Sequence, residues 1–141
     1  MSSAQLIQRL KKGHQAIATA ITQIRETVRS YSQAKPFLRI LEQAVINHLE
    51  CQDARFFQQL AAFYAEDREA LKMLEFLTFE LKELKVKYLV FSDAYPAQHI
   101  GDSGRRNFSK DFSEFAEAAI GRIRMENEYL LPLLQRMVNG D

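Results

Sequence analysis

Apolar residues recur at intervals of three and four positions along most of the chain, a pattern typical of helices with one buried face. The first stripe begins after Ser2 and Ser3, either of which can cap the free amide groups of a helix start. Pro132 interrupts the last stripe and is expected to kink or weaken that helix. Four helices are therefore predicted, over about residues 3–29, 36–60, 66–88 and 108–137.

The segments between the stripes are mostly short. Residues 32–36 supply the first break, and a tight turn is expected near residues 62–65. Residues 92–107 collect two glycines and a proline with little apolar periodicity, so they are predicted to form the one long loop. Four helices with mostly short connections predict an all-α, antiparallel (up-down-up-down) four-helix bundle in a single domain spanning residues 1–141.

Composition narrows the class of protein further. The chain has 141 residues, of which 47% are hydrophobic and 26% charged, so it is too apolar for a disordered chain and too polar for a membrane protein. Its formal net charge of +1 gives no overall field that would attract nucleic acid or an anionic membrane. A single cysteine, Cys51, cannot form an internal disulfide, and no secretory signal opens the chain. We expect a cytoplasmic protein that binds neither nucleic acid nor membrane.

Several polar residues lie on the apolar stripes, where a bundle would bury them. Bundles build cofactor sites from the inward side chains of facing helices, so these positions are the candidate site. Residues four apart share a helix face, and each of two stripes carries such a polar pair. The candidate residues are His14 on the first stripe, His48 and Gln52 on the second, Arg68 on the third, and Arg122 and Glu126 on the fourth.

This order of residues resembles the hemerythrin-like, HHE cation-binding family. In that family a His, a His-x-x-x-Glu, a second His and a second His-x-x-x-Glu line a four-helix bundle and hold two iron ions. The run Leu130-Leu131-Pro132 also matches the hydrophobic and proline run that follows the family's second His-x-x-x-Glu. The resemblance covers nearly the whole chain, and it implies that His14 and His48 match metal-binding histidines and that Glu126 matches a bridging carboxylate.

Three positions depart from the family pattern. The resemblance places Gln52 where the other bridging carboxylate stands, and Arg68 and Arg122 where the histidines of the second iron stand. An arginine stays protonated and cannot donate a lone pair to a metal, so a second iron site cannot form. We expect the guanidinium groups of Arg68 and Arg122 to occupy that volume, with Glu126 bonding them as it would have bonded the ion.

Three functions follow as expectations. The first is a non-enzymatic interaction or regulatory module without a cofactor, with an unknown protein partner, as a monomer or homodimer. The second is a sensor or carrier of one non-heme iron, held by His14, His48 and Glu126 with Gln52 as a weak oxygen ligand. The third is a small-anion pocket, because two arginines against one glutamate leave spare positive charge. We favour the first.

Structural roles are the alternative for each candidate residue. A lone buried histidine is more often hydrogen-bonded within the core than bound to a metal, and this applies to His14 and His48. Arg122 and Glu126, four residues apart, match an ordinary surface ion pair worth about 0.3–0.5 kcal/mol. Gly13 directly precedes a candidate position and is expected either to allow close helix approach or to have no role.

Overall fold

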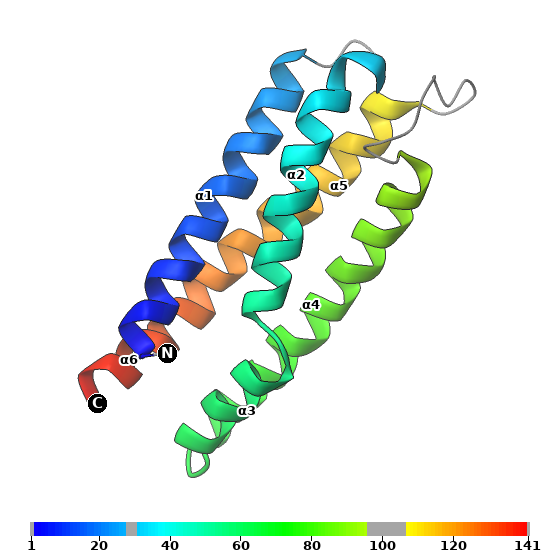
Figure 1. The fold of residues 1–141 in the computed structure, drawn as a ribbon. Helices are drawn as coiled ribbons and strands as arrows, with labels where there is room; N and C mark the ends of the chain where they lie inside the picture. Colours follow the sequence, from blue (N-terminus) through cyan, green and yellow to red (C-terminus); the bar gives the residue numbers. More distant parts are fainter. Residues whose placement is uncertain (1, 28–30, 96–106, 141) are drawn as a thin grey trace.

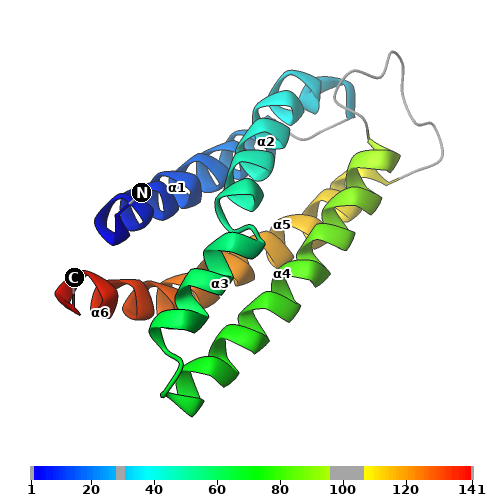
Figure 2. The ribbon, with the colours of Figure 1, turned by 60° about the horizontal axis from the view of Figure 1, so that its bottom comes forward.

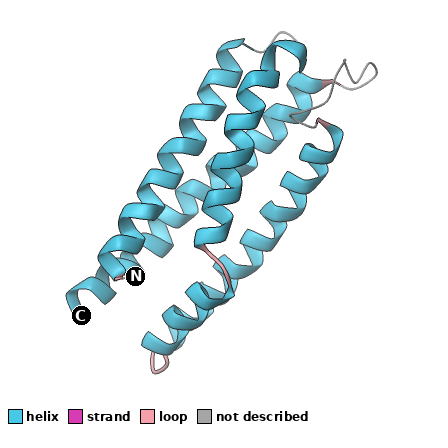
Figure 3. Cartoon of the chain, in the orientation of Figure 1, coloured by secondary structure: helices cyan, strands magenta, loops and turns pink. Residues whose placement is uncertain are grey.

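The computed structural model describes residues 2–27, 31–95 and 107–140, and within these ranges it contains helices and no strands (Figure 3). The prediction of an all-α protein is confirmed for these residues. The elements, labelled in Figure 1, are α1 (Ser3–Thr27), α2 (Tyr31–Cys51), α3 (Ala54–Phe63), α4 (Arg68–Ala94), α5 (Phe108–Met125), the π-helix η1 (Glu126–Leu130) and α6 (Leu131–Gly140).

The helices form long segments that lie alongside one another. Helices α1 and α2 run side by side in opposite directions, and α3 extends beyond the end of α2 (Figures 1 and 2). Helix α4 returns and packs on α5, which continues through η1 into α6. Because α6 packs on α1, the start of the first helix and the end of the last lie at the same end of the molecule.

The second predicted helix is divided in the structure. Helix α2 begins at Tyr31, so the break predicted at 32–36 is wrong and these residues are helical. Pro36 lies inside the helix, where its ring has no N–H to donate to the carbonyl of Ser32. Helix α2 ends at Cys51, and α3 begins two residues after Gln52. Asp53 caps α3, its carboxylate accepting a hydrogen bond from the amide of Phe56. The sequence prediction of one helix to residue 60 is therefore wrong.

The third helix begins close to where it was predicted. The chain turns over residues 64–67, and the carboxylate of Asp67 caps α4 by accepting from the amide of Ala70. At its other end α4 continues to Ala94, so the first part of the predicted loop at 92–107 is helical. Asn107 caps α5. Residues 96–106 of that loop lie outside the described residues, and His99 lies outside with them.

The interruption expected at Pro132 takes the form of a π-turn. Proline has no N–H to donate to the carbonyl four residues earlier. The helix widens just before it, and the amide of Leu131 donates to the carbonyl of Glu126, five residues back. Single π-turns inside helices are frequent at functional sites, and this one begins at a candidate site residue.

The buried apolar residues form two clusters. The first, here named the α3 cluster, includes Leu10, Leu60, Leu74 and Leu130. The second, here named the α2 cluster, includes Ile21, Leu41, Phe91 and Phe112. On α1 the two clusters are separated by His14, and on the α5 to α6 segment by Arg122 and Glu126. The buried candidate residues thus form a polar layer across the middle of an otherwise apolar interior.

One face of α4 carries large apolar side chains that the core does not cover. They lie on the side of α4 opposite its buried residues: Phe76, Phe79, Val86, Leu89 and Val90, between 44% and 66% exposed. No helix within the described ranges is long and apolar enough to cross a membrane.

Phe91 should be among the most stabilising residues of the α2 cluster. Its ring contacts four other aromatic rings, including a stacked contact with Phe115. We expect Phe91→Ala to lower the free energy of unfolding by about 3–5 kcal/mol, measured by denaturant titration. The control is Leu89→Ala on the same helix, which is 65% exposed and should change stability by about 0.5 kcal/mol or less. Equal effects of the two substitutions would contradict the described packing.

Candidate functional site

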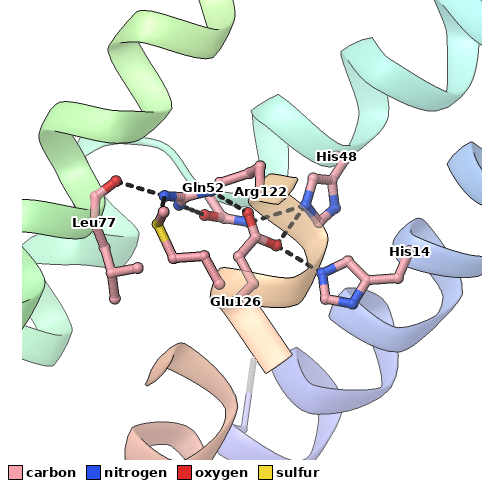
Figure 4. A network of polar contacts seen from close by, with 7 residues as sticks. His14, His48, Gln52, Leu77, Arg122 and Glu126 are labelled. Carbon is pink, nitrogen blue, oxygen red and sulfur yellow. Dashed lines mark hydrogen bonds and ion pairs between the residues drawn. The ribbon is translucent and has the colours of Figure 1, made fainter. Parts of the chain in front are cut away.

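Side chains from three separate helical segments converge in the polar layer (Figure 4). They form a polar network, defined here as His14 from α1, His48 from α2, Gln52 directly after α2, Arg122 from α5 and Glu126 at the start of η1. All five are buried. The structure thus brings together five of the six residues that the sequence pattern singled out.

Glu126 is the centre of the network and is fully buried. Its Oε1 atom lies 2.6 Å from Nε2 of His14 and 2.7 Å from Nε2 of His48. Its Oε2 atom accepts a hydrogen bond of 2.5 Å from Nε of Arg122. An ionised carboxylate only accepts hydrogen bonds, so each of the two histidines presents a protonated Nε2 to it in this arrangement.

The guanidinium of Arg122 is bonded on all three of its nitrogens. Besides its bond to Glu126, Nη1 donates to the backbone carbonyl of Leu77 at 2.8 Å, and Nη2 donates to Oε1 of Gln52 at 2.9 Å. The sulfur of Met125 lies 3.9 Å from Nη1. The alternative of an ordinary surface ion pair is excluded by this burial, because Arg122 is only 4% exposed.

The surroundings of Glu126 keep it ionised. Burial by itself raises the pKa of a carboxyl group. Here the hydrogen bonds from His14 and His48, together with the charge of Arg122, more than offset burial and hold the pKa of Glu126 well below its ordinary value. The site therefore contains a permanent buried negative charge, balanced by the guanidinium of Arg122.

His48 lies between two helices that approach closely. Its Nε2 faces Glu126 and also lies 3.1 Å from Nε2 of Gln52, so one ring nitrogen has two polar neighbours. Its other nitrogen, Nδ1, is buried without a hydrogen-bond partner. A Cβ atom at Gly13 would lie 2.6 Å from Nδ1, which means that the imidazole occupies the space a side chain at Gly13 would need. Close helix approach is thus the role of Gly13.

Arg68 is the one candidate residue that the structure places elsewhere. It is the first residue of α4 and is exposed, so the expectation that its guanidinium fills the site is wrong. The residue of α4 that reaches the network is Leu77, nine positions later and about 13 Å further along the helix axis. Leu77 could not be singled out from the sequence because it contributes a backbone carbonyl, which no pattern of side chains reveals.

The exposed position of Arg68 leaves the site with less positive charge than the sequence predicted. With Arg68 outside, one buried guanidinium faces one buried carboxylate, and the nitrogens of Arg122 are already bonded. The spare positive charge expected for a small anion between Arg68 and Arg122 is therefore not present.

Three of the five network residues have a donor set that suits a metal ion. One ligand atom each from His14, His48 and Glu126 lie within 4.8 Å of one another. Two imidazoles and a carboxylate are the set found in mononuclear non-heme iron centres. Among the residues that the structure describes, no such set lies on the side of Glu126 that faces Arg122, where a guanidinium and a peptide carbonyl meet.

Comparisons of the chain with protein families, with curated proteins and with solved structures give no match. What is inferred about the site therefore depends on its own geometry.

Removing the charge of Glu126 should destabilise the protein in a pH-dependent way. Glu126→Gln leaves the buried Arg122 without its counter-charge, and we expect a loss of about 3–5 kcal/mol in the free energy of unfolding at pH 7. Because folding lowers the pKa of Glu126, its contribution is fully present above the unfolded-state value of about 4.3 and is lost as the pH falls below it. Denaturant titrations between pH 7 and 2 should show the wild type and variant converging.

The matched control for this series is Glu128→Gln, an exposed carboxylate on the same segment. It should leave both the stability and its pH dependence close to those of the wild type. A Glu126→Gln variant that loses stability with falling pH as steeply as the wild type would show that Glu126 is not the group responsible.

Two glycines allow the described helix contact to be tested. Alanine at Gly13 would meet the His48 ring, whereas nothing lies within 4 Å of a Cβ at Gly121. We expect Gly13→Ala to destabilise the protein, and Gly121→Ala to be neutral or to stabilise it by up to about 1 kcal/mol through helix propensity. Thermal unfolding of the two variants checks this, and a gain in stability for both would contradict the contact at His48.

Proposed function

We propose that the chain is a hemerythrin-like, antiparallel four-helix-bundle domain in which a buried charge network takes the place of a two-metal centre. In this proposal it acts as a non-enzymatic interaction or regulatory module that needs no metal to fold. The observation that carries the proposal is the position of Arg122. Its guanidinium bonds Glu126, Gln52 and the Leu77 carbonyl, in the part of the site where the family pattern calls for a second metal.

Charge balance supports the metal-free state. Arg122 and Glu126 together are neutral, and both are buried. A divalent ion bound beside this neutral pair would add two positive charges. No further carboxylate of the network would compensate them, so the interior would carry a net charge of about +2. Uncompensated buried charge is costly, so the existing ion pair opposes metal binding.

The arrangement also favours an interaction role over catalysis. The polar side chains of the network are bonded mainly to one another, and burial raises the pKa of the nearby Cys51 thiol, which keeps it in its less reactive form. Exposed apolar patches, in contrast, often mark protein–protein contacts, and the outward face of α4 carries such a patch. A second copy of the chain is the first partner to test, by measuring the molar mass in solution.

A second candidate function is the binding of a single transition-metal ion as a sensor or carrier. It is favoured by the convergence of ligand atoms from His14, His48 and Glu126 on one buried point. If an ion is bound there, these three residues hold it. Gln52 would serve as the weak oxygen ligand only after its Oε1 atom leaves the hydrogen bond that it accepts from Arg122. The ion would supply redox chemistry or Lewis acidity, while Arg122 would keep the site mononuclear by occupying the other side of Glu126.

Metal analysis separates the two candidates. The protein, purified from iron-supplemented cells, is measured for metal content and for its melting temperature with chelator and with added Fe²⁺, Mn²⁺ or Zn²⁺. The proposal expects substoichiometric metal and a melting temperature that does not respond to chelator or to any of the ions.

The contrary outcome is equally specific. One metal per chain that stabilises the wild type and the Glu128→Gln control, but not His48→Ala, would contradict the metal-free module and establish the single-metal candidate. Because Glu128 is an exposed carboxylate of the same segment, it controls for metal bound loosely at the surface.

A further inference from the structure

The outward face of α4 carries an apolar stripe that runs along the helix. Phe76, Phe79, Val86 and Val90 follow the alternation of three and four residues typical of helix pairs, with Glu83 at the midpoint. The four apolar side chains are each at least 44% exposed, and the stripe is about 21 Å long. Helix α4 lies at an edge of the molecule in both ribbon views (Figures 1 and 2). Within the described residues, this face is therefore open to a helix of another molecule.

The stripe is close to symmetric about Glu83. Phe76 and Val90 each lie seven residues from it, and Phe79 and Val86 lie four and three residues from it. A dimer with a two-fold axis uses the same patch on both copies, so residue i contacts residue j and residue j contacts residue i. When two copies of α4 lie antiparallel with their midpoints together, Phe76 of each copy meets Val90 of the other. Phe79 and Val86 meet in the same way, so the stripe is complementary to a reversed copy of itself.

The charges beside the stripe change sign along the helix. Residues 75–80 carry two carboxylates, Glu75 and Glu80, and no basic residue, whereas residues 82–87 carry three lysines and one glutamate. An antiparallel second copy places the acidic half of the face opposite the basic half, and a parallel copy places like charges together. Complementary charge fixes the register and orientation of an interface. The charge pattern therefore favours antiparallel pairing of α4 with itself.

One pair of residues makes this complementarity specific. Glu80 and Lys87 are seven residues apart, so they lie on the same flank of the stripe. In two-fold antiparallel pairing this flank faces the same flank of the second copy, and Glu80 of each copy lies opposite Lys87 of the other. Within the described residues, no salt bridge engages either side chain. Two intermolecular ion pairs can therefore form without breaking an existing one.

We propose that the outward face of α4 is a dimer interface, on which the same helix of a second copy of this chain lies antiparallel. This inference rests on the interaction role of the proposed function and names the partner. A membrane surface fits the face less well, because helices that lie on membranes are rich in Lys and Arg on their polar side, and the acidic half of α4 would be repelled by anionic lipid.

Charge reversal tests the pairing. The molar mass is measured against protein concentration by analytical ultracentrifugation, in low-salt buffer with chelator, and we expect the wild type to form a reversible dimer. Glu80→Lys and Lys87→Glu each place like charges opposite one another in both pairs, so each should raise the dissociation constant on the order of tenfold. An equimolar mixture of the two variants should dimerise about as tightly as the wild type, because opposite charges then face each other in both pairs.

The matched controls make the same charge changes on other helices. Lys11→Glu and Glu50→Lys alter exposed residues of α1 and α2, and each should dimerise within about twofold of the wild type, because exposed charges at a distance are screened.

An apolar substitution tests the stripe itself. Phe79→Glu should leave the protein monomeric and folded, as circular dichroism would verify, because Phe79 is 57% exposed and is not part of the core. The control is Ile40→Glu, which changes an apolar residue of similar exposure (52%) on α2 and should leave the dimer intact.

Three results would overturn the proposal: a wild type that stays monomeric up to about 1 mM, single charge reversals without effect, or a mixture of variants no more dimeric than either alone. A monomer that binds anionic vesicles through Phe79 would likewise overturn it and assign the face to a membrane. A metal-free monomer would contradict this inference and leave the metal-free state of the proposed function standing. A dimer that holds one metal per chain would do the reverse.

Discussion

The ion pair between Arg122 and Glu126 is the constraint on which the interior of this protein depends. A charged residue in the middle of an apolar helical core is tolerable only when its charge and its hydrogen-bonding groups are satisfied. Glu126 meets this condition through Arg122 on one oxygen and two imidazoles on the other, and Arg122 meets it through Gln52 and the carbonyl of Leu77. Removing any member leaves its neighbours with unmet bonds.

The polar layer also shapes the helices around it. It separates the α3 cluster from the α2 cluster, so the long helices are held together by apolar packing at both ends and by polar bonds in the middle. The irregular points of the backbone lie here too. The break between α2 and α3 comes just after Gln52, and the π-turn begins at Glu126. Gly13 has no side chain, so the imidazole of His48 can occupy the space that a Cβ atom at this position would need.

The sequence predicts the helices well and the site in large part. Apolar spacing reveals which face of each helix is buried, and polar residues on that face must meet, which is why His48, Arg122 and Glu126 could be singled out. Arg68 was misplaced because its spacing of three from Leu71 puts it on an apparent stripe, whereas the buried line of α4 passes through Ala70, Leu74 and Leu77. Asp67, a good N-cap residue, is the signal that marks Arg68 as the first residue of the helix. The acceptor at Leu77 is a backbone atom, and side-chain patterns carry no information about it.

The state of the Arg122 side chain tests the central claim most directly. In metal-free protein, NMR of the arginine Nε–H groups separates a buried, bonded guanidinium from the solvent-exposed ones by its slow exchange with water. The account predicts one strongly protected Nε–H signal that disappears in Arg122→Lys and shifts in Glu126→Gln. A metal-free wild-type protein whose arginine Nε–H groups all exchange rapidly, as exposed side chains do, would contradict it.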